Sequence, residues 1–301
     1  MKIAIAGGTG FIGEPLARRL AEKHQVLILT RDPRRVKAGR AVEWKPGHTG
    51  WESQIADADG FVNLAGENIG EGRWTEERKA VLRRSRLEAT EALVGAMRRS
   101  PRPGRVLVNA SAIGYYGARG DETLDETAGP GADFLAELVR EWEAAAKQAE
   151  GLARVAILRF GIVLAAEGGA LKKMLLPFRM FAGGPLGSGE QWMSWVDRDD
   201  VVRMIEWALE RDSVRGIYNA TAPSPVRNRE FTRELGRALN RPAIIPAPAF
   251  ALRALLGEMA DPLLLTGQRI VPDRARREGF EFRYPDLVSS LRHAISGATG
   301  G

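Results

Sequence analysis

The first thirteen residues constrain the fold most strongly. An apolar run, Ile3 to Ala6, is typical of a buried strand, and it breaks at once into a glycine-rich stretch, G-G-T-G-F-I-G, that ends at Gly13. An amphipathic helix is predicted to follow, with Leu16 and Leu20 on its apolar side. A strand, a tight turn and a helix in this order are the context in which a glycine fingerprint predicts dinucleotide binding.

Each glycine of this stretch has a predicted physical role. Gly7 allows the tight turn, Gly10 lets the backbone approach a pyrophosphate, and Gly13 lets the helix pack closely on the strand. The free N–H groups and the positive end of the helix dipole then bind the phosphates. The alternative, an ordinary glycine-rich connection, is less favoured in this strand-to-helix context. We therefore expect cofactor contacts at Gly7, Thr9, Gly10, Phe11, Ile12 and Gly13.

The end of the second predicted strand, Gln25 to Thr30, bears on the choice of nicotinamide cofactor. In a Rossmann unit an acid at this place accepts hydrogen bonds from the 2′-hydroxyl of NAD, whereas a base accommodates the 2′-phosphate of NADP. Arg31 is the first residue after the strand, and a guanidinium binds phosphate through two parallel hydrogen bonds. The sequence therefore predicts NADP(H) in preference to NAD(H). Asp32 is the residue that would reverse this preference.

Two later strands are predicted to end at the same edge of the sheet. Gly60 to Leu64 is a buried strand, and Leu64, Ala65 and Gly66 are expected to lie under the nicotinamide ribose and pyrophosphate. Arg105 to Ala110 is the next strand. Ligands of open parallel sheets bind beyond the carboxyl ends of the strands.

Three hydroxyl side chains follow the Arg105 to Ala110 strand and are candidates to face the nicotinamide. They are Ser111, Tyr115 and Tyr116. In the alternative interpretation, Ser111 caps a turn and both tyrosines pack with their hydroxyls at the surface. The sequence leaves these two interpretations open.

The motifs together resemble one family. G-G-T-G-F-I-G, N-L-A-G and N-A-S-A-I-G-Y-Y-G are similar to the extended short-chain dehydrogenase/reductases, the relatives of sugar-nucleotide epimerases and dehydratases. S-W-V-D-R-D-D-V-V near residue 200, P-A-F-A-L-R-A-L-L-G-E near 250 and G-F-E-F-R-Y-P near 282 resemble its atypical "epimerase family" subgroup. The resemblance runs along nearly the whole chain. It implies a Rossmann domain with a small C-terminal lobe, NADP(H) binding, and a strand end at Phe160 and Gly161 that passes the nicotinamide.

One departure from the family pattern concerns the catalytic pair. Ordinary members of the superfamily carry Tyr-x-x-x-Lys on the helix after the serine strand. The lysine lowers the pKa of the tyrosine, and the tyrosine exchanges a proton with the substrate oxygen as hydride moves. Aligned by position, Phe134 stands where the tyrosine would be and Leu138 where the lysine would be. Neither side chain can do this chemistry.

The departure leaves three alternatives open. Tyr115 or Tyr116 replaces the missing acid, or another group such as Arg86 or Glu67 does so, or the protein binds NADP(H) without hydride transfer. The favoured hypothesis is an NADP(H)-dependent oxidoreductase or epimerase-like enzyme acting on a small polar molecule. A nucleotide sugar is expected only by analogy with the family. The rival hypothesis is a non-catalytic NADP(H) sensor or partner-binding protein.

Composition narrows the remaining function classes. The 301 residues include no cysteine and three histidines that do not pair at ligand spacing, so no metal site is expected. The net charge is +6, but the basic residues are interleaved with acids, so nucleic-acid binding is not expected. No apolar run approaches the ~20 residues of a membrane span, so no membrane contact is expected. A strand that starts at residue 2 leaves no room for a signal peptide, and the cytoplasm is the expected location.

The predicted fold is a doubly wound parallel α/β Rossmann sheet with a small α+β lobe. Residues 1–163 and 195–222 are assigned to the Rossmann domain, and residues 164–194 and 223–301 to the lobe. In the lobe, Phe280, Phe282 and Tyr284 alternate with charged residues, which predicts a half-buried strand. Helices exposed on such sheets often form dimers, so a homodimer is among the expected assemblies.

Overall fold

The structure is a computed structural model that describes residues 1–45 and 49–296. Outside the described part lie residues 46–48 and the last residues assigned to the lobe, 297–301. Its centre is a seven-stranded sheet in the order β11-β7-β5-β4-β1-β2-β3, in which every neighbouring pair is parallel. This confirms the predicted Rossmann-like fold. The strands are β1 (Lys2–Ala6), β2 (Gln25–Thr30), β3 (Arg40–Glu43), β4 (Gly60–Asn63), β5 (Val106–Ala112), β7 (Arg154–Phe160) and β11 (Gly216–Ala220).

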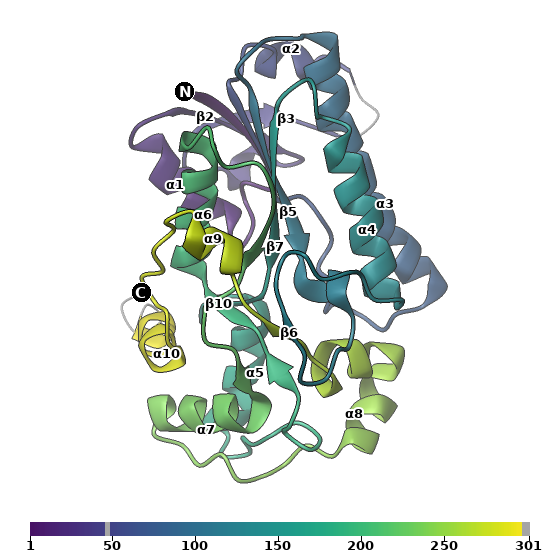
Figure 1. Cartoon of the computed structure of the whole chain (residues 1–301), viewed down its shortest axis with the longest axis vertical. Helices are drawn as coiled ribbons and strands as arrows, with labels where there is room; N and C mark the ends of the chain where they lie inside the picture. Colours follow the sequence, from purple (N-terminus) through teal and green to yellow (C-terminus); the bar gives the residue numbers. More distant parts are fainter. Residues whose placement is uncertain (46–48, 297–301) are drawn as a thin grey trace.

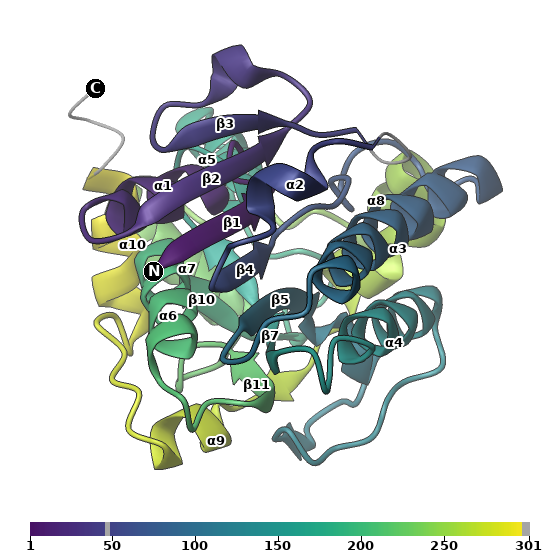
Figure 2. The ribbon, with the colours of Figure 1, turned by 90° about the horizontal axis from the view of Figure 1, so that it is seen from above.

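Strand β1 lies in the interior of the sheet because its side chains are apolar on both faces. Ile3 and Ile5 belong to the core that includes α1 (Gly13–Ala21) and α6 (Arg198–Glu210), whereas Ala4 and Ala6 belong to the opposite core. That second core includes residues of α3 (Glu76–Arg99) and α4 (Phe134–Lys147), and Figure 2 shows the two helix layers on either side of the sheet. The strand order reverses between β1 and β4, and ligands of such sheets bind beyond the carboxyl ends at this switch point.

A small lobe lies below the sheet in Figure 1. Its apolar core joins Leu171, Leu175 and Phe178 to Phe231 and Leu291. Among the helices that the structure describes, none combines the length and the apolar character that a bilayer crossing requires. The lobe elements are α5 (Gly169–Arg179), α7 (Asn228–Leu239), α8 (Ala249–Leu256), α10 (Leu287–Ser296) and the short pair β9 (Trp192–Met193) with β12 (Val226–Arg227). The pair β8 (Ile162–Leu164) with β10 (Trp195–Asp197) borders both cores, since Val196 lies in the large core and Trp195 in the lobe core.

Part of the range predicted for the lobe packs on the large domain instead. Ala275 and Phe280 lie in the core that contains Trp207 of α6 and Tyr218 of β11. The rings of Phe280 and Trp207 are 5.5 Å apart. The short elements of this region and of the rest of the large domain are α2 (Glu52–Ile55), β6 (Thr123–Leu124), its partner β13 (Arg269–Ile270) and α9 (Asp273–Arg277).

The half-buried strand predicted around Phe280 to Tyr284 is wrong. The structure has no strand there, although Phe280 is buried and its neighbours are more exposed. The carboxylate of Asp200 on α6 accepts the backbone N–H groups of Arg283 (2.8 Å) and Tyr284 (2.9 Å). The alternating burial therefore comes from rings packed on α6 and from a side-chain tether, not from strand pairing.

Candidate functional site

The glycine loop between β1 and α1 has no room for side chains at two positions. Gly7 adopts a φ of +79°, and a Cβ atom there would lie 2.7 Å from the backbone of Leu64. A Cβ atom on Gly13 would lie 2.1 Å from the carbonyl oxygen of Gly7, so α1 can pack this closely only with glycine. The loop thus has the turn and the close helix packing expected of these two residues.

The start of α1 presents backbone donors at the carboxyl edge of the sheet. Ile12 is the N-cap residue, and no side chain caps the first turn. Gly10 is exposed, and a Cβ atom on it would meet only the carbonyl oxygen of Gly7, at 3.2 Å. The N–H of Glu14 donates to the carbonyl oxygen of Gly10 at 2.9 Å, and Pro15 has no N–H. The positive end of the helix dipole, with no capping side chain and beside an open glycine surface, fits the phosphates of a dinucleotide.

Phe11 connects this loop to the lobe. A Cβ atom on Gly168 would lie 2.5 Å from its ring, and one on Gly169 would lie 3.0 Å from it. The guanidinium carbon of Arg198 lies 5.3 Å from the ring centroid. Phe11 thus contacts the lobe, whereas its neighbour Ile12 packs against the large core and its neighbour Gly10 is exposed.

The end of β2 distinguishes Arg31 from Asp32. The carboxylate of Asp32 accepts hydrogen bonds from the Arg34 side chain at 2.9 and 3.2 Å and from its backbone N–H at 3.2 Å. The Arg34 guanidinium therefore holds the pKa of Asp32 below its usual value. Arg31 is exposed, and no hydrogen bond or ion pair joins its side chain to any residue that the structure describes. At the end of β2, the Asp32 carboxylate is therefore bonded by Arg34, and the Arg31 guanidinium has no partner among the described residues.

The predicted segment Leu64 to Gly66 continues from β4 and is held by its neighbours. Asn63 accepts the backbone N–H of Ala65 through its side chain at 3.2 Å. The guanidinium of Arg86 lies directly on Gly66, where a Cβ atom would be 3.3 Å from its Cζ. Arg86 donates to the carbonyl oxygen of Glu67 at 3.1 Å, and burial lowers the pKa of its guanidinium to about 10. Arg86 thus fixes the loop that leaves β4.

Ser111 belongs to a buried charge cluster. Its hydroxyl donates to Oε1 of Glu143 at 2.7 Å. The same carboxylate pairs with Arg159 through Nε at 2.7 Å and Nη2 at 2.8 Å. The side chain of Glu143 is 4% exposed and that of Arg159 is 1% exposed. Ser111 lies opposite Arg159 in the β5–β7 register, so neighbouring strands bring the hydroxyl and the ion pair together.

The two predicted tyrosines meet the same cluster in different ways. The hydroxyl of Tyr116 is buried, donates to Asn219 at 2.7 Å and accepts from Arg159 at 2.9 Å. Burial raises the pKa of Tyr116. Tyr115 is half-buried, and its ring centroid lies 3.4 Å from the guanidinium carbon of Arg159. No hydrogen bond to the Tyr115 hydroxyl is found within the described residues.

Phe134 and Leu138 occupy the start of α4 as expected, and both lie in an apolar cluster. The Phe134 ring packs edge-on against Trp74, with centroids 5.2 Å apart, and Leu138 is buried in the same cluster. Asp133 caps the helix by accepting the N–H of Ala136 at 2.8 Å. The helix is therefore in place without a proton donor at either position of the usual pair.

Phe160 and Gly161 end β7. Phe160 is half-buried and packs against the large core. Gly161 donates its N–H to Ala220 at 3.0 Å, and a Cβ atom on it would lie 2.6 Å from the carbonyl oxygen of Ser194. Close packing against the chain before β10 therefore explains the glycine by itself.

Sequence reasoning missed three members of the charge cluster: Glu143, Arg159 and Asn219. Arg159 lies within a strand, R-V-A-I-L-R-F, that is apolar from Val155 to Leu158, and a charge next to such a run is the signal that could have identified it. Charged residues are almost never fully buried unless they are paired. Finding its partner required the position of α4 relative to β7.

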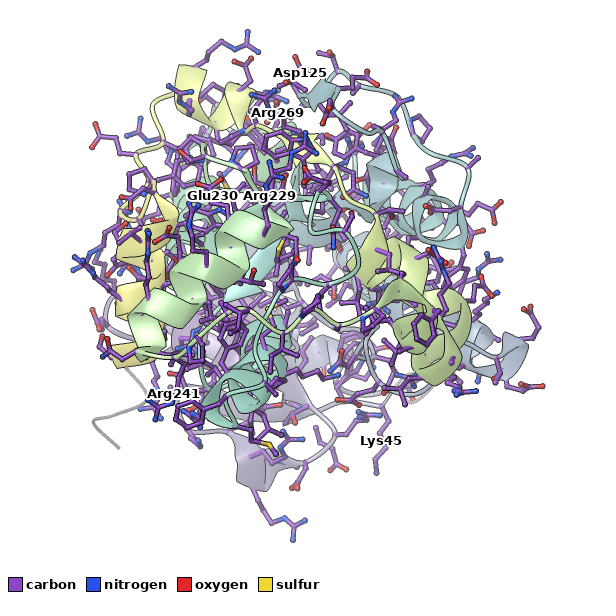
Figure 3. All side chains as sticks on the ribbon, turned by 90° about the horizontal axis from the view of Figure 1, so that it is seen from below. Lys45, Asp125, Arg229, Glu230, Arg241 and Arg269 are labelled. Carbon is purple, nitrogen blue, oxygen red and sulfur yellow. The ribbon has the colours of Figure 1, made fainter. Side chains whose placement is uncertain are left out.

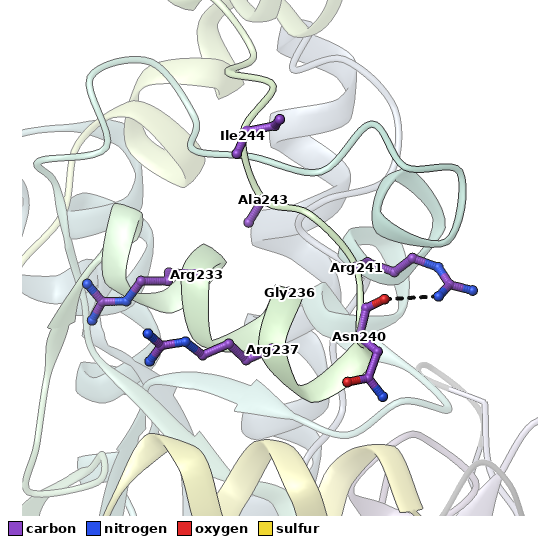
Figure 4. Close-up of a pocket in the computed structure, with 7 residues that line it drawn as sticks. All are labelled: Arg233, Gly236, Arg237, Asn240, Arg241, Ala243 and Ile244. Atoms are coloured by element: carbon purple, nitrogen blue, oxygen red, sulfur yellow. Dashed lines mark hydrogen bonds between the residues drawn. The ribbon is translucent and has the colours of Figure 1, made fainter.

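A pocket of about 620 Å³ lies away from this edge, between α7 and the segment that follows it. Figure 4 shows Arg233 and Arg237 pointing to one side and Arg241 to the other, so the three guanidinium groups do not converge. Arg233 and Arg237 bond Glu234 at 3.1 and 2.8 Å, and Arg241 donates to the carbonyl oxygen of Asn240 at 3.0 Å. We assign no anion site there.

Comparison with known proteins gives a consistent result along the chain. The pattern of the NAD dependent epimerase/dehydratase family matches residues 3–221, and a domain of unknown function, DUF1731, matches residues 247–294. The chloroplastic epimerase family protein SDR39U1 homolog of Arabidopsis thaliana is 43% identical over 97% of this chain and 86% of its own length. The epimerase family protein ML0860 of Mycobacterium leprae is 41% identical over 98% of this chain and 95% of its own length. Human epimerase family protein SDR39U1, solved with NADPH, superimposes with a TM-score of 0.88 at 35% identity, over 98% of this chain and 99% of that one.

Proposed function

The chain belongs to the NAD dependent epimerase/dehydratase family, and from this premise we propose that it binds NADP(H) and transfers hydride to or from a small carbonyl or alcohol substrate. The human relative solved with NADPH supports this choice of cofactor. The glycine loop would hold the pyrophosphate, and the segments around Gly66 and Gly161 would lie along the nicotinamide half. When bound, NADPH supplies the hydride.

The observation that carries the cofactor proposal is the arrangement at the end of β2. Arg31 is exposed without a partner in the described chain, while Arg34 occupies the carboxylate of Asp32. NAD would need that carboxylate free to accept the ribose hydroxyls. NADP(H) would need only the guanidinium that is already free.

Calorimetric titration of Arg31→Ala with NADPH and NADH tests this proposal. A charge-assisted hydrogen bond contributes roughly 1.5–3 kcal/mol, so NADPH affinity should fall about 10- to 100-fold while NADH affinity stays unchanged. Arg84→Ala is the matched control, because Arg84 is an exposed arginine on α3. Equal losses for both cofactors, or no loss for NADPH, would contradict the proposal.

Within this function, we assign the proton transfer to Tyr115. Its hydroxyl is not used by another described residue, whereas the Tyr116 hydroxyl is bonded to Asn219 and that of Ser111 to Glu143. Glu143, which Ser111 bonds, and Tyr116 would then hold Arg159 against the Tyr115 ring. Tyr115→Phe should lower turnover by roughly 10²–10⁴ and leave the NADPH dissociation constant unchanged. Unchanged turnover would remove Tyr115 from the mechanism.

A second function, a non-catalytic NADP(H) sensor, is favoured by the apolar surroundings of Phe134 and Leu138. It predicts NADPH binding with no oxidation of bound NADPH across a panel of aldehydes and ketones. It further predicts that NADPH and NADP⁺ give different protease-digestion patterns. Consumption of NADPH with any member of the panel, lost in Tyr115→Phe, would decide for the enzyme.

A further inference from the structure

The lobe exposes an unusual amount of apolar surface. Of the nine large apolar side chains that are exposed in the described chain, seven lie between residues 176 and 255. Phe250 is 76% exposed and Leu176 is 62% exposed. We call these seven the apolar face: Leu176, Met180, Phe181, Ile244, Ile245, Phe250 and Leu255.

Backbone contacts join the two segments that carry the apolar face. Ile245 donates its N–H to Gly183 at 3.1 Å, just after α5, and Gly187 donates to Ala247 at 2.8 Å, just before α8. The Arg241 guanidinium lies 4.6 Å from the Phe181 ring centroid. Figure 3 looks onto this end of the molecule, where α5, α7 and α8 lie together and Arg241 is labelled.

The two segments that carry the apolar face contain only positive charges, although Glu190, Glu234 and Glu258 stand directly beyond them. Residues 168–189 and 235–257 contain no Asp or Glu but six Lys or Arg residues. Within the described part of the chain, four of the six have no carboxylate partner: Lys172, Lys173, Arg179 and Arg241. On α5, Leu171 and Leu175 face the lobe core, whereas Lys172 and Leu176 are exposed. One surface of α5 therefore combines apolar and cationic side chains.

The same surface borders the proposed cofactor site. Helix α5 begins against Phe11 of the glycine loop. Lys173 donates to the carbonyl oxygen of Gly70 at 2.6 Å, and Arg73 donates to the carbonyl oxygens of Ala254 and Leu255 at the end of α8. Both helices are thus bonded to the loop that leaves Gly66. The helices that carry the apolar face therefore adjoin the loop that follows Gly66.

We propose that the substrate is an anionic amphiphile, whose apolar chain lies on the apolar face and whose acidic group meets Lys172 and Arg179. This inference rests on the proposed function, because the ligand of the apolar face is taken to be the substrate that reacts with the bound cofactor. Large exposed apolar patches mark binding sites, and unpaired cations beside them select a negative ligand. A second copy of the chain fits less well, since a symmetric contact would bring the same cations against each other.

Binding of dodecyl phosphate to the NADPH-loaded protein, below the critical micelle concentration, tests the proposal. Saturable binding is expected by calorimetry, at least tenfold tighter than that of dodecyl maltoside or inorganic phosphate. Leu176→Ser and Phe250→Ser should each weaken it at least threefold, and Lys172→Glu at least tenfold. Val288→Ser is the matched control, because Val288 is a 40% exposed apolar residue on α10. It should change nothing.

Three results would overturn the proposal. The first is no saturable binding of dodecyl phosphate by protein that binds NADPH normally. The second is binding only to vesicles that contain phosphatidylserine, which would assign the apolar face to a membrane surface. The third is a dimer in light scattering that Leu176→Ser dissociates, which would assign the face to a second copy. Loss of NADPH binding itself would instead contradict the proposed function, and it is measured separately.

Discussion

Neutralising Glu143 should destabilise the fold far more than neutralising its exposed neighbour on α4. The Glu143 carboxylate accepts three hydrogen bonds of 2.7–2.8 Å, one from Ser111 and two from Arg159. Glu143→Gln keeps the shape but leaves the Arg159 guanidinium, which is 1% exposed, without a counter-charge. Breaking a buried pair in this way costs about 3–5 kcal/mol of unfolding free energy.

Urea denaturation measures this loss, with Glu141→Gln as the control. Glu141 is 41% exposed and pairs with Arg83 at 3.2 Å, so its neutralisation should cost less than about 1 kcal/mol. Fluorescence and circular dichroism must give coincident transitions before the free energies are compared.

A double variant separates the ion pair from its surroundings. Replacing Glu143 by Leu together with Arg159 by Met exchanges the pair for apolar side chains, so it should cost less than the sum of the two single changes, by about 2 kcal/mol or more. A loss below about 1 kcal/mol for Glu143→Gln, or one equal to that of Glu141→Gln, would refute the reasoning.

Three further predictions concern separate parts of the chain. Gly13→Ala should abolish NADPH binding and lower the melting temperature, because its Cβ atom would lie 2.1 Å from the Gly7 carbonyl oxygen; NADPH binding equal to wild type in calorimetry would contradict this. Asp133→Ala should cost about 1 kcal/mol in urea denaturation, because the N–H of Ala136 loses its cap; no loss would show that the cap is dispensable. Burial raises the pKa of Tyr218 to about 12, so the folded state holds this proton more tightly than the unfolded chain does. The free energy of unfolding should therefore fall between about pH 10 and 12, by roughly 1–3 kcal/mol. In urea titrations at alkaline pH, Tyr218→Phe should reduce this fall, and an equal fall in the variant would assign it to other groups.

The architecture was predictable because its signals are local. An apolar run that ends in glycines identified β1 and the start of α1, and the polar residues after Thr30 identified the end of β2. The requirement for glycine at position 13 also follows from the local path of the chain, as does the positive φ of Gly7, whereas the contact of Gly7 with Leu64 does not. Such features need no knowledge of distant contacts.

The charge cluster was not predictable because it depends on distant contacts. Ser111 was placed correctly at the end of β5, but its bond to Glu143 depends on how α4 lies over β7. The alternating pattern around Phe280 misled for a related reason, because burial there comes from Trp207 of α6. The periodicity of apolar residues in the sequence indicates which side chains are buried, but it does not identify the element that buries them.

The state of Asp32 likewise required coordinates. The sequence places two arginines and an acid within four residues after β2, and either charge could have faced the ribose. The structure shows that Arg34 bonds the acid and leaves Arg31 free.

The selectivity of the wild-type protein between NADPH and NADH tests the central claim most directly. Calorimetric dissociation constants for the two cofactors, measured in the same low-salt buffer, give the ratio. The free Arg31 and the occupied Asp32 predict NADPH binding at least tenfold tighter than NADH binding. Equal affinities, or tighter binding of NADH, would show that the carboxylate of Asp32 and not the guanidinium of Arg31 meets the ribose.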